Sequence, residues 1–147
     1  MRRLGRRAFA SLLASAWLIG CAGATTEPEP LHSDVDLARS TWLAEGATSY
    51  SFEISTASSW SRPSGYVRVQ VAGGRVVTAV APDGVSPLAF PPPTIDEIWD
   101  SILSARERGQ LNSVQFDRRG VPIETDVGPW PVDGGVHWSV RGFTRAR

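Results

Sequence analysis

The sequence predicts an α+β fold: a mainly antiparallel sheet of about five strands with two helices on one face, in the order α-β-β-β-α-β-β. Three observations carry this prediction. Apolar and polar residues alternate in the segments 50–55, 67–71 and 136–141, and a period of two is typical of half-buried strands. Residues 95–103 carry an apolar stripe at helical spacing instead. Runs of consecutive strands separated by single helices are typical of an antiparallel sheet with helices packed on one face.

The first 21 residues predict an exported chain that is anchored by lipid. Four arginines at positions 2–7 precede an apolar run over 8–19, which is the layout of a bacterial signal peptide at 1–20. The end of this segment, Leu18-Ile19-Gly20-Cys21, resembles the lipobox of bacterial lipoproteins. This resemblance implies that the Cys21 thiol is acylated, with palmitate among its chains. The run is shorter than the about 20 apolar residues of a spanning helix. The alternative for Cys21 is a buried core thiol.

The residues after the cysteine predict the location of the domain. Residues 21–33 are rich in proline, threonine and glutamate and predict a flexible tether. Its ten residues 22–31, at about 3.1 Å per residue, would hold the domain roughly 30 Å from the lipid. Ala22 follows the cysteine, and by resemblance to lipoprotein sorting signals the lack of aspartate there implies the outer membrane, facing the periplasm, over the inner one in a Gram-negative host. Arg6-Arg7 resembles part of a twin-arginine signal, so both export routes stay open.

Composition predicts one mildly acidic domain at 34–144. The leader holds four of the 15 basic residues and none of the 15 acidic ones, so the chain beyond it has a formal charge of −4. Nucleic-acid-binding proteins usually carry a clustered basic face, and we therefore expect no nucleic-acid partner. Because Cys21 is the only cysteine, its acylation excludes disulfides, thiolate catalysis and cysteine metal sites.

The first half of the domain predicts a short helix followed by three strands. The helix covers 34–45, with Ser33 or Asp34 as its cap and Gly46 at its end. Segment 50–55 is a strand, 57–65 a polar loop, and 67–80 a hairpin around Gly73-Gly74, since glycine tolerates the positive φ of a two-residue turn. This turn predicts the cross-strand pairs Ala72–Arg75, Val71–Val76, Val69–Thr78 and Val67–Val80.

The second half predicts a well-defined helix and two further strands. Thr94 and Glu97 have the spacing of a capping box, and Gly109 ends the helix. Its apolar stripe consists of Ile95, Ile98, Trp99, Ile102 and Leu103. Segment 114–116 begins the next strand, 117–120 forms a turn, and Pro122 indicates that the segment after this turn is an edge or irregular strand. Residues 128–135 form a loop, and 136–143 is the last strand.

Four features recur in this order along residues 34–143: Trp42 eight residues before Tyr50, the glycine-turn hairpin at 67–80, the helix opening at 94–98, and Phe116-Asp117 followed by Gly120-Val121-Pro122. With this order of elements, the chain resembles the uncharacterised bacterial lipoprotein family known as domain of unknown function 6174. Many members of this family carry a cysteine pair just after the first strand, whereas this chain has Ser58-Ser59-Trp60 there, so any such disulfide is absent. The resemblance implies a fold and a location but no mechanism.

The sequence predicts no catalytic residue, metal site or cofactor. It lacks a Gly-x-Ser-x-Gly motif, a phosphate-binding loop and a nucleotide fingerprint, and its acidic residues lack calcium-loop spacing. His137 is the histidine expected inside the domain, and it points away from the core because Val136 and Trp138 point inward. It acts as a general base only if a carboxylate orients it. The candidates near it in sequence are Asp117, foremost, and Glu124, Asp126 and Asp133.

Five tryptophans lie beyond the leader, and they predict packing and binding roles. Trp42, Trp99 and Trp138 fall on core faces, whereas Trp60 and Trp130 lie in proline-containing loops, where aromatic residues serve as interface anchors. Together with Arg62 and Arg141, these two are the predicted partner-binding residues. We therefore expect a non-enzymatic, membrane-anchored envelope lipoprotein that binds an unknown envelope protein or ligand. The alternatives are a small envelope hydrolase or ligand binder that uses His137 with a loop carboxylate, and a structural envelope component.

Overall fold

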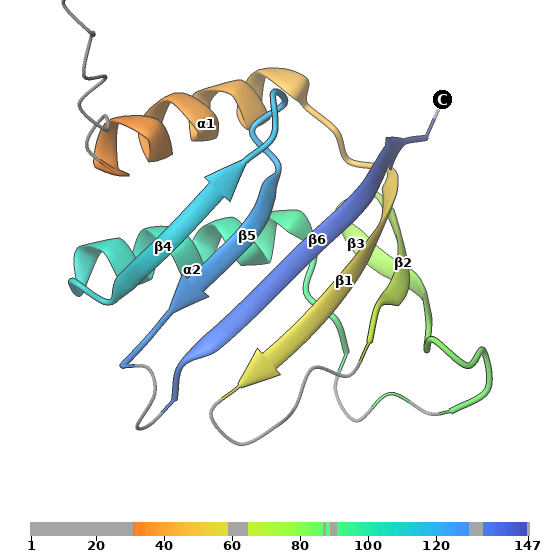
Figure 1. Cartoon of the computed structure of the whole chain (residues 1–147). Coiled ribbons are helices and arrows are strands. Elements are labelled where there is room, and N and C mark those ends of the chain that lie inside the picture. Colours follow the sequence, from red (N-terminus) through yellow and green to blue (C-terminus); the bar gives the residue numbers. More distant parts are fainter. Residues whose placement is uncertain (1–30, 59–64, 87, 89–90, 130–133, 147) are drawn as a thin grey trace, which may run out of the picture.

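A computed structural model describes residues 31–58, 65–86, 88, 91–129 and 134–146. Eight elements follow one another in this part of the chain: α1 (Leu31–Glu45), β1 (Tyr50–Ser58), β2 (Val67–Ala72), β3 (Arg75–Val80), α2 (Ile95–Glu107), β4 (Leu111–Phe116), β5 (Pro122–Val127) and β6 (Val136–Arg145). The strands form one antiparallel sheet in the order β3-β2-β1-β6-β5-β4 (Figure 1). The predicted α+β class is confirmed, with six strands where about five were expected.

The additional strand is β5, which the sequence predicted to be an edge or irregular strand. The edge position is wrong, because β5 lies inside the sheet between β6 and β4, whereas its pairing with β4 is irregular as the other alternative expected. Pro122 is the first residue of β5, where its missing N–H lies at the end of the hydrogen-bond ladder, and proline is tolerated at this position of a strand. The pairing with β4 slips next to Pro122, between Gln115 and Phe116, and again at the other end, between Leu111 and Ser113.

The β2–β3 hairpin has the predicted glycine turn but only half of the predicted register. Ala72 pairs with Arg75 and Val71 with Val76 as expected, and the pairing then shifts by one residue. Beyond the shift the pairs are Gln70–Thr78, Val69–Ala79 and Arg68–Val80. The expected Val69–Thr78 and Val67–Val80 pairs are therefore wrong. The β-bulge inserts one residue into β3 at Val77, which is 61% exposed.

Helix α1 begins earlier than the sequence suggested. It starts at Leu31, so Ser33 and Asp34 lie inside the helix and neither is its cap, and residues 31–33 of the expected tether are helical. Gly46 ends the helix as predicted, with a φ of 59° that favours glycine.

Helix α2 has the predicted boundaries and both predicted caps. The Glu97 amide donates to Thr94 Oγ1 at 3.2 Å, and the Thr94 amide donates to Glu97 Oε2 at 2.7 Å. At the other end the Gly109 amide donates to the Arg106 carbonyl and the Gln110 amide to the Ala105 carbonyl, which is a Schellman motif. The Ile95 amide donates to the hydroxyl of Tyr50 on β1, at 3.1 Å. Burial raises the pKa of Tyr50 to about 12.

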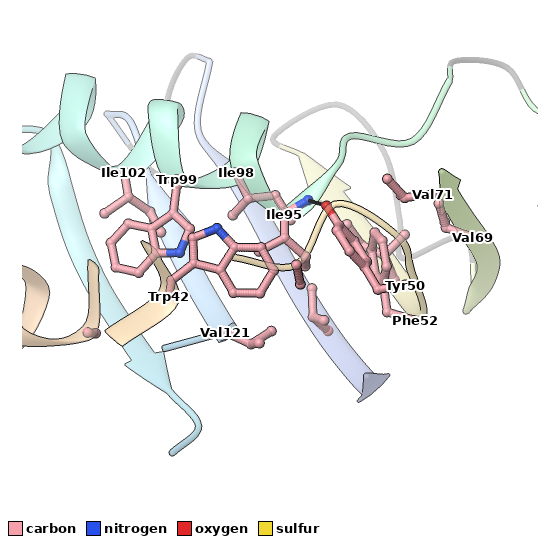
Figure 2. Packing of buried hydrophobic residues seen from close by; sticks show 14 of the residues in the cluster. Trp42, Tyr50, Phe52, Val69, Val71, Ile95, Ile98, Trp99, Ile102 and Val121 are labelled. Atoms are coloured by element: carbon pink, nitrogen blue, oxygen red, sulfur yellow. Dashed lines mark hydrogen bonds between the residues drawn. The ribbon is translucent and has the colours of Figure 1, made fainter. Parts of the chain in front are cut away.

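One hydrophobic core lies between the helices and one face of the sheet (Figure 2). Its largest fully buried side chains include Trp99, Tyr50, Phe52, Ile95, Ile98 and Ile102. Trp42 and Trp99 are buried and Trp138 packs against the cluster, so all three predicted packing tryptophans contact the core. Both buried indole N–H groups have acceptors: Trp42 donates to Asp96 Oδ1 at 2.8 Å, and Trp99 to the Gly120 carbonyl at 3.1 Å. The opposite face of the sheet has no helix over it in the described part of the chain (Figure 1).

Candidate functional site

A row of polar side chains crosses the uncovered face of the sheet, and we call this row the open-face cluster. It consists of Arg68 on β2, Glu53 on β1, Ser139, Arg141 and His137 on β6, Glu124 on β5, and Tyr66 just before β2. These residues alternate with the buried ones on each strand, so the packing of the core places them on the outer face. Strands β1 and β6, which are far apart in sequence, bring the two halves of the row together.

The first half of the cluster is centred on the Glu53 carboxylate. Arg141 Nε donates to Glu53 Oε2 at 2.8 Å, and Arg68 Nη2 lies 3.6 Å from Glu53 Oε1. The hydrogen bond from Arg141 lowers the pKa of Glu53 below its usual value, with the charge of Arg68 acting in the same direction. The Arg141 guanidinium also stacks on Tyr66, with its carbon 3.6 Å from the ring centroid. Arg141 is therefore held on two sides.

The second half of the cluster is a chain of hydrogen bonds around the Glu124 carboxylate. The hydroxyls of Tyr66 and Ser139 lie 3.0 Å apart, and Ser139 Oγ donates to Glu124 Oε1 at 2.5 Å. His137 Nε2 lies 2.9 Å from Glu124 Oε2, and both side chains are about 40% exposed. The carboxylate thus stands between the hydroxyl and the imidazole. This order differs from the arrangement that activates a serine, in which the imidazole lies between the hydroxyl and the carboxylate.

An open depression of about 410 Å³ lies at the arginine end of the cluster. Its lining residues are Glu53, Tyr66, Arg68, Val80, Ala81, Pro82, Asp83, Gly84 and Arg141. Asp83 begins a tight loop in which its Oδ1 accepts the amides of Val85 and Ser86, at 3.0 and 2.9 Å, and its Oδ2 accepts the Ser86 hydroxyl. These bonds, the Ser86 hydroxyl foremost, lower the pKa of Asp83 to about 2.

Comparison with known proteins gives one result. A family model described as "Family of unknown function (DUF6174)" matches residues 34–145, which is most of the chain. The chain belongs to the DUF6174 family. No curated protein and no solved structure matches it.

The DUF6174 domain brings only some of the predicted site residues together. His137 points to the open face as expected, and its carboxylate partner is Glu124, which lies on a strand and not on a loop. Asp126 pairs with His137 in the β5–β6 register, but no ion pair joins their side chains among the described residues. The expected pairing of His137 with Asp117 does not form. Asp117 lies in the β4–β5 turn at the far end of β5, where its Oδ1 accepts the amides of Arg119 and Val121.

The remaining predicted residues divide into two groups. Arg141 lies in the open-face cluster and lines the depression, and its partner-binding role stays a prediction. Trp60, Arg62, Trp130, Asp133 and Cys21 lie outside the described residues. Neither a group of three metal-ligating side chains nor a helix able to cross a bilayer occurs within the part of the chain that the structure describes.

Four members of the open-face cluster were not singled out from the sequence: Glu53, Tyr66, Arg68 and Ser139. The alternation within each strand places three of them on the outer face, and that signal was available. The contact of Glu53 with Arg141 spans 88 residues and depends on the pairing of β1 with β6. The order of strands in the sheet brings Glu53 and Arg141 together, and the alternation of apolar and polar residues does not predict that order.

Proposed function

We propose that this member of the DUF6174 family is a lipid-anchored envelope lipoprotein whose domain binds a partner without catalysing a reaction. The observation that carries the anchor is Cys21 directly after an apolar run with an arginine-rich start, ten residues before α1 begins. Acylation with more than one chain makes such an anchor durable, since one chain alone binds a bilayer only marginally. The location proposed is the periplasmic face of the outer membrane in a Gram-negative host.

The open-face cluster supports the binding part of this proposal. The helices cover one face of the sheet and leave the other to polar side chains that are ordered by each other. Arg141, for example, is fixed by Glu53 and by Tyr66 while remaining 58% exposed. Side chains that are already ordered lose little conformational entropy when a partner binds, which favours binding. Arginine and tyrosine are also enriched among the residues that dominate interfaces.

Intact mass and membrane fractionation of the wild type and of Cys21→Ser test the anchor. We expect a wild-type product that begins at Cys21, carries the mass of acyl chains and fractionates with membranes. The serine variant should lack the acyl mass and lose the membrane association. A wild-type product that is unacylated and remains in the soluble fraction would contradict the proposal and leave Cys21 as a free thiol.

The second candidate function is a small hydrolase or ligand binder that uses His137, and the 2.9 Å contact with Glu124 is the observation in its favour. A carboxylate in this position can orient an imidazole as a general base. A panel of ester and phosphoester substrates tests the candidate, with Arg108→Ala as a folded control outside the cluster. Turnover that His137→Gln abolishes would support the hydrolase, whereas turnover that survives in this variant would exclude His137 as the base. A structural component would show neither turnover nor partner binding.

A further inference from the structure

The depression beside β3 presents cationic hydrogen-bond donors without acceptors in the described part of the chain. Arg68 is 69% exposed, and its contact with Glu53 at 3.6 Å is an ion pair without a hydrogen bond. Arg141 uses its Nε for Glu53, and its two terminal nitrogens have no acceptor among the described residues. A guanidinium carries five N–H donors in a planar fork. Most of the donors of this arginine pair are therefore available to a ligand.

The acidic groups of the depression are already engaged. Glu53 accepts from Arg141 and lies beside Arg68, and its pKa is lowered accordingly. Asp83 directs its oxygens to Val85 and Ser86 within its own loop. An incoming cation would compete with these contacts, whereas an incoming anion would find unused donors. Charge-assisted hydrogen bonds to arginine are also stronger than neutral ones, and carboxylates and phosphates fit its fork.

Part of the depression is lined by apolar residues, which begin beside Arg68. Val80, Ala81 and Pro82 line the depression, and Val80 is the cross-strand neighbour of Arg68. A ligand whose charged group meets the arginines would therefore lay an attached apolar chain against these side chains. About 410 Å³ is within the range of small-molecule sites, roughly 300–1,000 Å³.

We propose that this depression binds a phosphate or carboxylate group carried on a short apolar chain, with Arg68 and Arg141 holding the anion and Val80 to Pro82 contacting the chain. The inference rests on the proposed binding function and names the ligand class for one end of the open-face cluster. A free phosphate ester and an anionic lipid headgroup have this chemistry in common. Lipid is one of these two sources because the proposed anchor keeps the domain near a bilayer.

A nuclear magnetic resonance titration of the ¹⁵N-labelled full chain in a non-ionic detergent tests the proposal. The probe is monobutyl phosphate, and inorganic phosphate and butyltrimethylammonium are the comparators. We expect saturable shifts of the Arg68 and Arg141 Nε–H signals and of the amides from Val80 to Gly84. Inorganic phosphate should bind several-fold more weakly at the same signals, and the ammonium compound should leave them unchanged.

Two variants make the test specific. Arg68→Ala should weaken binding of monobutyl phosphate at least tenfold, and because this side chain is exposed the variant should fold as the wild type does, which its amide spectrum checks. Arg108→Ala removes an arginine outside the depression and should leave the affinity unchanged. Equal binding by the ammonium compound, or unchanged affinity in Arg68→Ala, would overturn the proposal. The same shifts in phosphatidylglycerol but not in phosphatidylcholine nanodiscs would identify a lipid headgroup as a source.

The outcome separates this inference from the proposed function. Absence of any saturable shift would overturn the anion site and leave the acyl anchor, which is measured by mass, and partner binding elsewhere on the open face unaffected. Conversely, a chain that proves to be unacylated could still bind monobutyl phosphate.

Discussion

The β4–β5 turn contacts α1 so closely that a single methyl group at Gly120 should disrupt the domain. A Cβ atom at this position would lie 2.1 Å from the Ala38 carbonyl oxygen and 2.8 Å from the Trp42 amide nitrogen. Ala38 and Trp42 are four residues apart in α1, so these two atoms belong to the helix backbone at the positions of an i to i−4 hydrogen bond. The new methyl group would therefore meet backbone atoms, and no side chain could rotate away to make room. An ordinary contact begins near 3.4 Å, so the turn and the helix must separate by more than an ångström.

Three terms give the expected cost of Gly120→Ala. The φ of 76° is left-handed, and alanine there costs about 1–2 kcal/mol. Overpacking of a tight contact costs about 1–3 kcal/mol. The Gly120 carbonyl also accepts the buried Trp99 indole N–H at 3.1 Å, and a displaced turn weakens this bond, which contributes about 1 kcal/mol. We therefore expect the free energy of unfolding to fall by about 3–6 kcal/mol, a large part of the about 5–15 kcal/mol typical of a domain.

Gly109→Ala is the matched control. Gly109 also has a left-handed φ, 65°, but a Cβ there would meet nothing within 4 Å. It should lose about 1–2 kcal/mol for the backbone conformation alone. Urea unfolding followed by tryptophan fluorescence, with Trp42 and Trp99 as buried reporters, measures both variants. If the two alanine variants lose the same stability, the argument from the close approach of α1 is refuted.

Three further predictions concern single residues. The pKa of Tyr50 is raised in the folded state, so the unfolded chain ionises first, and stability should fall by about 2–3 kcal/mol between about pH 10 and 12. Tyr50→Phe should flatten this decline in alkaline urea titrations; an unchanged slope would assign it to other groups. Thr94→Ala should lower the unfolding free energy by about 1 kcal/mol through loss of the capping box, against little change for the exposed Ser101→Ala. The pKa of Glu53 is lowered in the folded state, so its ionised form stabilises the fold at pH values above the ordinary pKa of 4.5. This stabilisation is lost as the pH falls through the lowered pKa. In Arg141→Ala the Glu53 pKa should rise, as carboxyl carbon shifts would report; an unchanged value would mean that Arg141 is not its main partner.

The features predicted correctly from the sequence are those whose physics is local. The capping box of α2 needs only Thr94 and Glu97, which are three residues apart, and both bonds form. The alternation around His137 predicts its face because successive side chains of a strand point to opposite sides. The fold class follows from such signals, since each helix and most strands carry their own period. Local patterns thus determine the kind and the approximate bounds of the elements.

The features that the sequence did not predict depend on contacts between distant segments. The hairpin shift at Val77 arises because β3 takes up one residue more than β2, which a two-residue turn does not reveal. The interior position of β5 depends on β6 pairing with both β1 and β5. Glu124 was one of several carboxylates near His137, and the β5–β6 pairing selects it over Asp117.

The separation of the two sheet faces predicts that the open-face cluster can be changed without loss of stability. Each strand of the sheet directs one set of side chains into the core and the alternate set outward, so the core fixes the spacing of the outer residues. Arg68 and Arg141 are 69% and 58% exposed, and exposed ion pairs contribute little to stability. Substitution of either should therefore alter binding far more than folding. Gly120 has the opposite character, because its contact with α1 holds the fold together and touches no part of the open face.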